Sequence, residues 1–105
     1  MTEEKVRKIR RTYQDAKALD SKITEAETAL ANFVELNGKP DTLGYQLRQQ
    51  YGQMTSVVSG LRQQRVDVIA KYNARSRQIT RSLWKDSGLP YQLQITNDQV
   101  GEVWE

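Results

Sequence analysis

The chain has 105 residues, of which 37% are hydrophobic and 28% are charged, and its net charge is +3 at pH 7. This length allows one domain, and the small apolar fraction favours an elongated helical protein over a globule with a large core. Cysteine and histidine are absent from the sequence, which excludes disulfides, thiolate chemistry and histidine-based catalysis or metal binding. We therefore expect a protein that is not an enzyme and that uses no cofactor, metal or small-molecule substrate.

The apolar runs are shorter than the roughly 20 residues that a helix needs to cross a bilayer. The charged start MTEEKVRKIRR is not followed by the apolar stretch of a secretory signal. The basic part of the first predicted helix also lacks the bulky aromatic face of a helix that binds membrane surfaces. We expect a cytoplasmic protein, or a component of a virion or another intracellular assembly, without membrane contacts.

Two long helices are predicted, over about 2–36 and 42–86, with a turn at 37–41. Asn37 and Gly38 tolerate the positive φ that commonly ends a helix, and Pro40 follows them. A short connection forces consecutive helices to run antiparallel. The sequence therefore predicts an all-α fold, a long coiled-coil-like helical hairpin over 1–88.

Apolar residues recur at alternating intervals of three and four in both predicted helices, as in a coiled-coil seam. Folding the chain near residue 38 places Leu30 opposite Leu47 and Ile9 opposite Val68, with apolar residues facing each other throughout. The predicted seam consists of Ile9, Ala16, Ile23 and Leu30 in the first helix and Leu47, Met54, Leu61 and Val68 in the second.

A two-helix seam buries too little surface to offset the chain entropy lost on folding, which is about 1–2 kcal/mol for each ordered residue. Apolar residues also lie outside the seam, for example Val34, Val57 and Val66. We expect the chain to self-associate, most simply as a dimer that forms a four-helix bundle. The alternative is a monomeric hairpin that is stabilised by docking on a larger partner.

The tail over 89–105 has a different character. Tyr91, Leu93 and Ile95 alternate with polar residues, which is a strand pattern. The sequence shows no second strand to pair with it. We expect an extended or partly disordered tail that adds to the sheet of a partner, pairs with its own copy in a dimer, or lies along the bundle.

Charge is unevenly distributed along the chain. Residues 1–17 carry six cations and three anions, and 42–85 carry eight cations and one anion. Residues 18–41 carry two cations and five anions, and 86–105 carry four anions. An antiparallel hairpin brings the two basic stretches together at its open end, which is the end opposite the turn.

The favoured function is a protein–protein interaction module or a small assembly or regulatory factor, such as a phage component, an accessory structural component or an inhibitor. Arginine binds carboxylates and phosphates through two hydrogen bonds, and aromatic residues anchor interfaces. The alternative is a nucleic-acid-binding hairpin that contacts phosphates at its basic open end. The predicted partner-binding residues are Lys8, Arg11, Arg62, Arg65, Arg75, Arg77, Arg81 and Trp84, with Tyr91, Leu93 and Ile95 in the tail.

Overall fold

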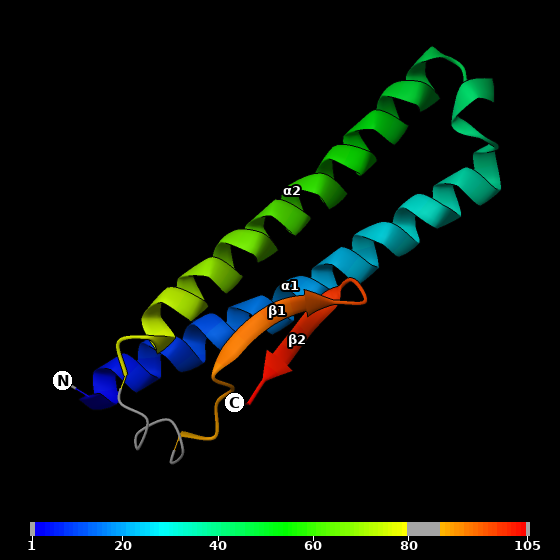
Figure 1. Cartoon of the computed structure of the whole chain (residues 1–105). Coiled ribbons are helices and arrows are strands. Elements are labelled where there is room, and N and C mark those ends of the chain that lie inside the picture. The colour runs from blue at the N-terminus through cyan, green and yellow to red at the C-terminus, as the bar shows by residue number, and fades with distance from the viewer. Residues whose placement is uncertain (1, 80–86, 105) are drawn as a thin grey trace.

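The structure is a computed structural model that describes residues 2–79 and 87–104. Two long antiparallel helices form a rod with extents of 58 × 22 × 14 Å, and a β-hairpin lies along part of it (Figure 1). The elements are α1 (Thr2–Asn37), a 3₁₀ turn η1 (Pro40–Thr42), α2 (Tyr45–Ser76), β1 (Gln92–Thr96) and β2 (Gln99–Val103). The predicted helical hairpin is thus confirmed.

The turn between the helices forms where the sequence predicts it. Gly38 has a φ of 93°, and its N–H donates to the carbonyl oxygen of Val34 at 2.8 Å, which closes the last turn of α1. Pro40 then begins the 3₁₀ turn, and Gly44 precedes the first residue of α2. The connection is therefore longer than the predicted 37–41.

The second helix ends earlier than predicted. α2 stops at Ser76, and residues 77–79 form a turn, so the prediction of one unbroken helix to residue 86 is wrong. Gln78 donates its N–H to the carbonyl oxygen of Arg75, and Ile79 donates its N–H to that of Ser76. These hydrogen bonds span three residues, as in a 3₁₀ turn at the end of a helix. The chain leaves the helix here and later returns along the rod.

The tail forms its own antiparallel sheet, so the expectation of a single unpaired strand is wrong. β1 pairs with β2 in a register that places Leu93 opposite Glu102 and Ile95 opposite Val100. Asn97 and Asp98, with φ values of 53° and 61°, form the two-residue turn that matches the twist of a hairpin. The sequence pattern does not predict β2, because Gly101 and Glu102 within it are residue types that are depleted in strands.

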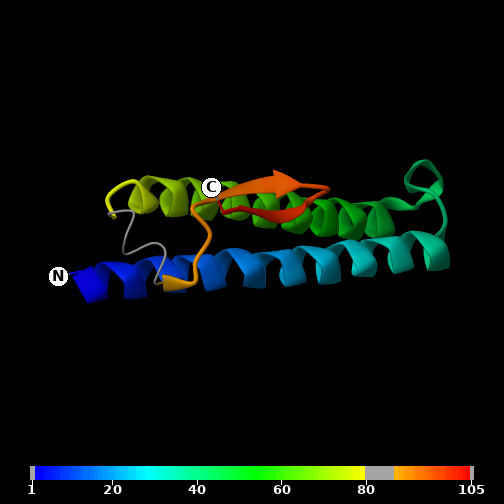
Figure 2. The ribbon, with the colours of Figure 1, turned by 60° about the horizontal axis from the view of Figure 1, so that its bottom comes forward.

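The β-hairpin covers the groove between the two helices over the half of the rod nearer the open end (Figures 1 and 2). β1 packs on α2, and β2 packs on α1. Two residues of the β-hairpin, Leu93 and Val100, are buried with side chains of both helices. The cluster contains Ile9, Ala16, Ile69, Tyr72, Leu89, Leu93 and Val100. The core of this half therefore has three layers instead of two.

The register of the helices differs from the prediction by about two helical turns. Contacts across the rod pair Thr12 with Arg75, Asp20 with Arg65, and Phe33 with Tyr51. The predicted facing pairs are wrong because the connection over 38–44 moves α2 along α1.

Burial along the predicted seam is uneven. Ile9, Ala16 and Ile23 are at most 1% exposed, as predicted. Toward the turn, Leu30 is half-buried and Leu47 is 37% exposed. Met54, Leu61 and Val68 are also half-buried. The seam is thus well covered only in part of the rod.

Candidate functional site

A buried guanidinium lies where the two helices and the tip of the β-hairpin meet. The side chain of Arg65 is 2% exposed although it lies at a seam position of α2. Its Nη1 donates to Asp20 Oδ1 at 2.8 Å and to the carbonyl oxygen of Asp98 at 2.9 Å, and its Nη2 donates to Asp98 Oδ1 at 2.8 Å. Arg65 therefore joins α1, α2 and the β-hairpin turn.

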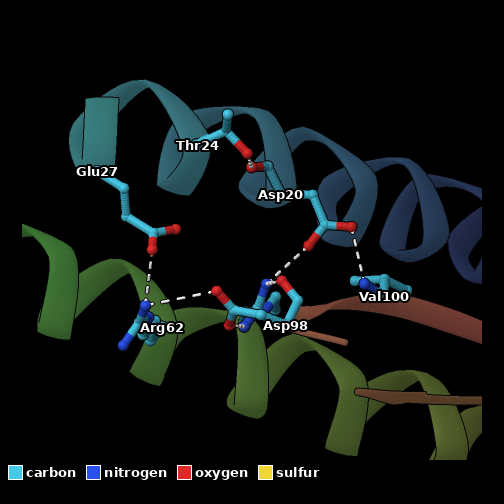
Figure 3. A network of polar contacts seen from close by, with 7 residues as sticks. Asp20, Thr24, Glu27, Arg62, Asp98 and Val100 are labelled. Atoms are coloured by element: carbon cyan, nitrogen blue, oxygen red, sulfur yellow. Dashed lines mark hydrogen bonds and ion pairs between the residues drawn. The ribbon is translucent and has the colours of Figure 1, made fainter. Parts of the chain in front are cut away.

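The contacts of Arg65 extend into a larger polar network (Figure 3). The second oxygen of Asp20 accepts the backbone N–H of Val100 at 2.8 Å, which ties β2 to α1. Arg62 lies one turn before Arg65, and its Nη2 is 2.9 Å from Glu27 Oε2 and 3.4 Å from Asp98 Oδ2. The network of Asp20, Glu27, Arg62, Arg65 and Asp98 thus fixes the tip of the β-hairpin.

The charges of this network stabilise one another. Burial lowers the pKa of Arg65, but hydrogen bonds to Asp98 and Asp20 outweigh this effect and raise it. The hydrogen bonds from Arg65 lower the pKa of the Asp98 carboxyl group. Arg65 therefore stays protonated and Asp98 ionised, which makes their contact a charge-assisted hydrogen bond. The Nε of Arg65 is buried and has no hydrogen-bond partner among the described residues.

Helix side chains also hold both outer edges of the β-hairpin. Asn73 donates from Nδ2 to the carbonyl oxygen of Leu93 at 3.0 Å and accepts the N–H of Leu93 at 2.8 Å, as a neighbouring strand would. Tyr72 donates its hydroxyl to the carbonyl oxygen of Pro90. On the β2 edge, Asp20 binds the N–H of Val100. These contacts occupy part of the backbone that an exposed edge strand would offer to other chains.

Tyr13 anchors the end of β2. Its hydroxyl donates to Glu102 Oε2 at 2.5 Å, and Lys17 Nζ lies 3.4 Å from the same oxygen. Burial, together with the bond to Glu102, raises the pKa of Tyr13 to about 12. The hydrogen bond from Tyr13 lowers the pKa of the Glu102 carboxyl group, and the charge of Lys17 adds to this effect. The β-hairpin is thus attached by polar contacts at its start, its tip and its end.

Several predicted partner-binding residues are used inside the chain instead. Arg65 and Leu93 are 2% and 1% exposed, so a partner cannot contact their side chains. Arg62 is paired with Glu27. Arg75 donates from Nη1 to the hydroxyl of Thr12 at 2.7 Å but remains exposed at the open end. No sequence pattern near Arg65 indicates its carboxylate partners, because Asp20 and Asp98 are 45 and 33 residues away.

The other predicted contact residues are not brought together in one place. Lys8, Arg11 and Arg77 are exposed, and they form no ion pair with the described residues. Tyr91 and Ile95 are 44% and 43% exposed. Arg81 and Trp84 lie outside the described residues.

A basic hollow of about 210 Å³ lies at the open end. Its lining residues are Lys5, Lys8, Ile9, Arg75 and Gln78. Ile9, which is 1% exposed, lies at its floor, and three cations line it. Lys5 is not among the predicted contact residues, although it lies three residues before Lys8 and therefore on the same helical face.

A second hollow lies between the helices nearer the turn and measures about 570 Å³. We call it the turn-half groove, lined by Glu27, Leu30, Ala31, Val34, Tyr51, Thr55, Val58, Ser59 and Arg62. The lining is mostly apolar, with one charged residue from each helix. The predicted seam and the off-seam Val34 indicated apolar surface here, but the sequence did not show that it would stay open.

Within residues 2–79 and 87–104, no group of three or more acidic side chains is placed to hold a metal ion. Neither helix, as far as the structure describes them, has the length and apolarity needed to span a membrane. Comparisons with known protein families, with curated proteins and with solved structures find no match for this chain.

Proposed function

We propose that this chain is a non-enzymatic protein–protein interaction module, a small assembly or regulatory factor that binds an acidic surface of a larger partner through its open end. The observation that carries the proposal is the basic hollow, which is lined by Lys5, Lys8 and Arg75 above the buried Ile9. Three cations that line one hollow fit a partner surface that presents carboxylates.

The distribution of charge along the rod supports this assignment. Residues 1–17 carry an excess of cations and lie beside the C-terminal part of α2, which carries Lys71 and Arg75, whereas 18–41 is acidic. Lys8, Arg11 and Arg77 add exposed positive charge in the basic stretches. Such a polar rod would steer an acidic partner to one end and would turn its acidic part away.

Nucleic acid is the second candidate, because phosphates would meet the same three cations of the basic hollow. Two aromatic residues in this half have other roles, since Tyr72 is fully buried and Tyr13 is bonded to Glu102. These two side chains are therefore not placed to stack on bases, which is how many single-strand binders hold nucleic acid. A protein partner is therefore favoured over nucleic acid.

The test compares two double variants of the full chain with equal changes in charge. Lys5→Glu/Lys8→Glu alters the basic hollow, and Lys22→Glu/Lys39→Glu alters exposed lysines elsewhere. The probe is a polyglutamate peptide at low salt, and binding is measured by fluorescence anisotropy. The first variant should weaken binding by about tenfold or more, because like charges would then face each other, and the second should bind nearly as wild type.

A single-stranded RNA oligonucleotide serves as the competing probe in the same assay. If RNA binds far more tightly than polyglutamate, and each lost lysine reduces the slope of binding against salt by about one, the nucleic-acid candidate replaces the protein partner. Equal binding of polyglutamate by both double variants would remove the basic hollow as the binding site.

A further inference from the structure

The turn-half groove begins where the β-hairpin ends. Glu27 and Arg62 line the groove, and Arg62 also contacts Asp98 at the β-hairpin tip (Figure 3). The groove and the interface under the β-hairpin are therefore consecutive parts of one interhelical surface. In the first part, Leu93 and Val100 fill the space between the helices, whereas no described segment fills the second.

The apolar surface of the groove is also incompletely buried. Leu30 and Tyr51, which line it, are half-buried. Leu47, one helical turn before Tyr51, is 37% exposed. In the covered half, the seam residues Ile9 and Ala16 are almost fully buried. The turn half therefore presents the apolar floor of an interface that lacks its third layer.

The two sides of the groove carry opposite charges. On α1, Glu27 lines the groove, and Glu35, eight residues later, lies about 80° further around the helix, at the edge of the groove. On α2, Arg48 and Arg62 lie fourteen residues apart and share a face. All four residues except Glu27 are exposed, and Glu27 is half-buried. Glu27 and Arg62 bind each other at the end of the groove near the β-hairpin. Beyond that pair, an occupant meets the negative charge of Glu35 along α1 and the positive charge of Arg48 along α2.

We infer that the turn-half groove binds an amphipathic helix of a protein partner. The apolar stripe of that helix lies on Leu30, Val34 and Tyr51. Its basic edge faces α1, and its acidic edge faces α2. The groove between two antiparallel helices is the usual place for a third helix, whose residues at intervals of three and four enter the seam. The β-hairpin binds the neighbouring part of this surface in a similar way. It places Leu93 and Val100 between the helices, and the Asp98 carboxylate contacts Arg62 and Arg65.

A second copy of the chain fits this surface less well. Stacking two copies antiparallel, groove on groove, would lay α1 on α1 and α2 on α2, so that glutamates oppose glutamates and arginines oppose arginines. Stacking them parallel would pair unlike charges, but the two β-hairpins would then occupy the same space between the rods. The charges and the β-hairpin together favour a single helix over a second rod.

The test uses three designed helical peptides with the same apolar stripe. One peptide carries lysine along one edge and glutamate along the other, the second carries glutamate on both edges, and the third carries lysine on both. Binding to the full chain is measured by isothermal titration calorimetry. The mixed peptide should bind about tenfold more tightly than either of the others, because only it pairs favourably with both sides of the groove.

Matched variants of the chain locate the binding. Val34→Glu places a charge in the groove and should weaken binding of the mixed peptide by about 30-fold, as for a residue at the centre of an interface. Val57→Glu makes the same change at a side chain that is 55% exposed and does not line the groove, so it should have little effect. Circular dichroism checks that both variants remain helical.

A labelling experiment keeps the test decisive if Val34→Glu does not fold. The sequence contains no cysteine, so Thr55→Cys puts a single environment-sensitive dye in the groove, and Val57→Cys puts it outside. The mixed peptide should change the emission only at residue 55. No such change, or equal binding of all three peptides, overturns the inference. A dimer of the chain alone that Val34→Glu dissociates would also overturn it, because it would make a second copy the occupant.

Discussion

The two halves of the rod are built on the same helical pair but differ in what lies over the groove between the helices. Near the open end, the β-hairpin fills the groove with Leu93 and Val100 and is held by side chains of both helices. Near the turn, the groove remains open over about 570 Å³. The comparison shows that a regular apolar seam does not by itself determine whether it is covered, because the covering segment comes from elsewhere in the chain.

The polar anchors explain how so short a tail can cover half of the rod. A two-stranded hairpin alone is marginally stable in water. Here Asn73 pairs with the edge of β1, Arg65 binds the tip, and Tyr13 binds the end of β2. Each contact adds to the burial of Leu93 and Val100, so the β-hairpin and the helices stabilise each other. We therefore expect single changes in the covered half to have larger effects than similar changes elsewhere.

The largest difference is expected between two arginines that are one helical turn apart. Arg65→Ala should lower the free energy of unfolding by about 3 kcal/mol, because it removes a buried partner from Asp20 and leaves a cavity. This value is at the low end for a buried ion pair, because Asp98 is half exposed and water can replace one contact. Urea unfolding followed by circular dichroism measures the change.

Arg62→Ala is the matched control for Arg65→Ala. Arg62 also contacts Asp98, but its side chain is 47% exposed, and its pairs with Glu27 and Asp98 lie at the surface. Surface ion pairs contribute little, so the loss should be below about 1 kcal/mol. Equal losses for the two variants would mean that the buried position of Arg65 does not matter for stability.

A smaller difference is expected between two leucines, one in each half. Leu93→Ala should lower the free energy of unfolding by about 2–3 kcal/mol, since Leu93 is 1% exposed and its removal leaves a cavity under the β-hairpin. Leu47→Ala, at a position that is 37% exposed, should lower it by less than about 1 kcal/mol. Thermal and urea unfolding test both variants, and a larger loss at Leu47 would contradict the comparison.

The helical hairpin could be predicted because its signals are local. The interval of three and four residues gives the helices, and Gly38 followed by Pro40 gives the turn. The buried stretch of α1 was also predictable, as Ile9 and Ala16 show. The register was not, because it depends on the length of the connection before Tyr45, and the turn residues alone do not determine that length.

The covered half could not be predicted because its contacts join residues far apart in sequence. The sequence indicates Arg65 only as one of several basic partner-binding residues. In the structure, Arg65 is buried because Asp20 and Asp98 come to it from α1 and the β-hairpin turn. The sheet was missed for a related reason, since β2 is weak as an isolated segment and forms against β1 and α1.

The smallest expected effect is a response of the β-hairpin to acid. Hydrogen bonds lower the pKa of Glu102, through Tyr13, and the pKa of Asp98, through Arg65. A carboxyl group with a lowered pKa in the folded state contributes stability above its unfolded pKa, near 4, and that stability is lost as the pH falls through the folded value. The β-hairpin should therefore loosen below about pH 4, before the helices unfold.

Amide hydrogen exchange at a series of pH values, corrected for the intrinsic rate, measures this local loosening. The protection of the Leu93 and Val100 amides should fall as the pH drops below about 4, whereas helical amides near the turn should keep theirs longer. Tyr13→Phe removes the donor to Glu102, so it should lower the protection at neutral pH and make the remaining protection less sensitive to acid. If the amides of β1 and β2 lose protection only together with those of the whole rod, the β-hairpin is part of one cooperative unit with the helices, and its carboxylate contacts do not form a separately released attachment.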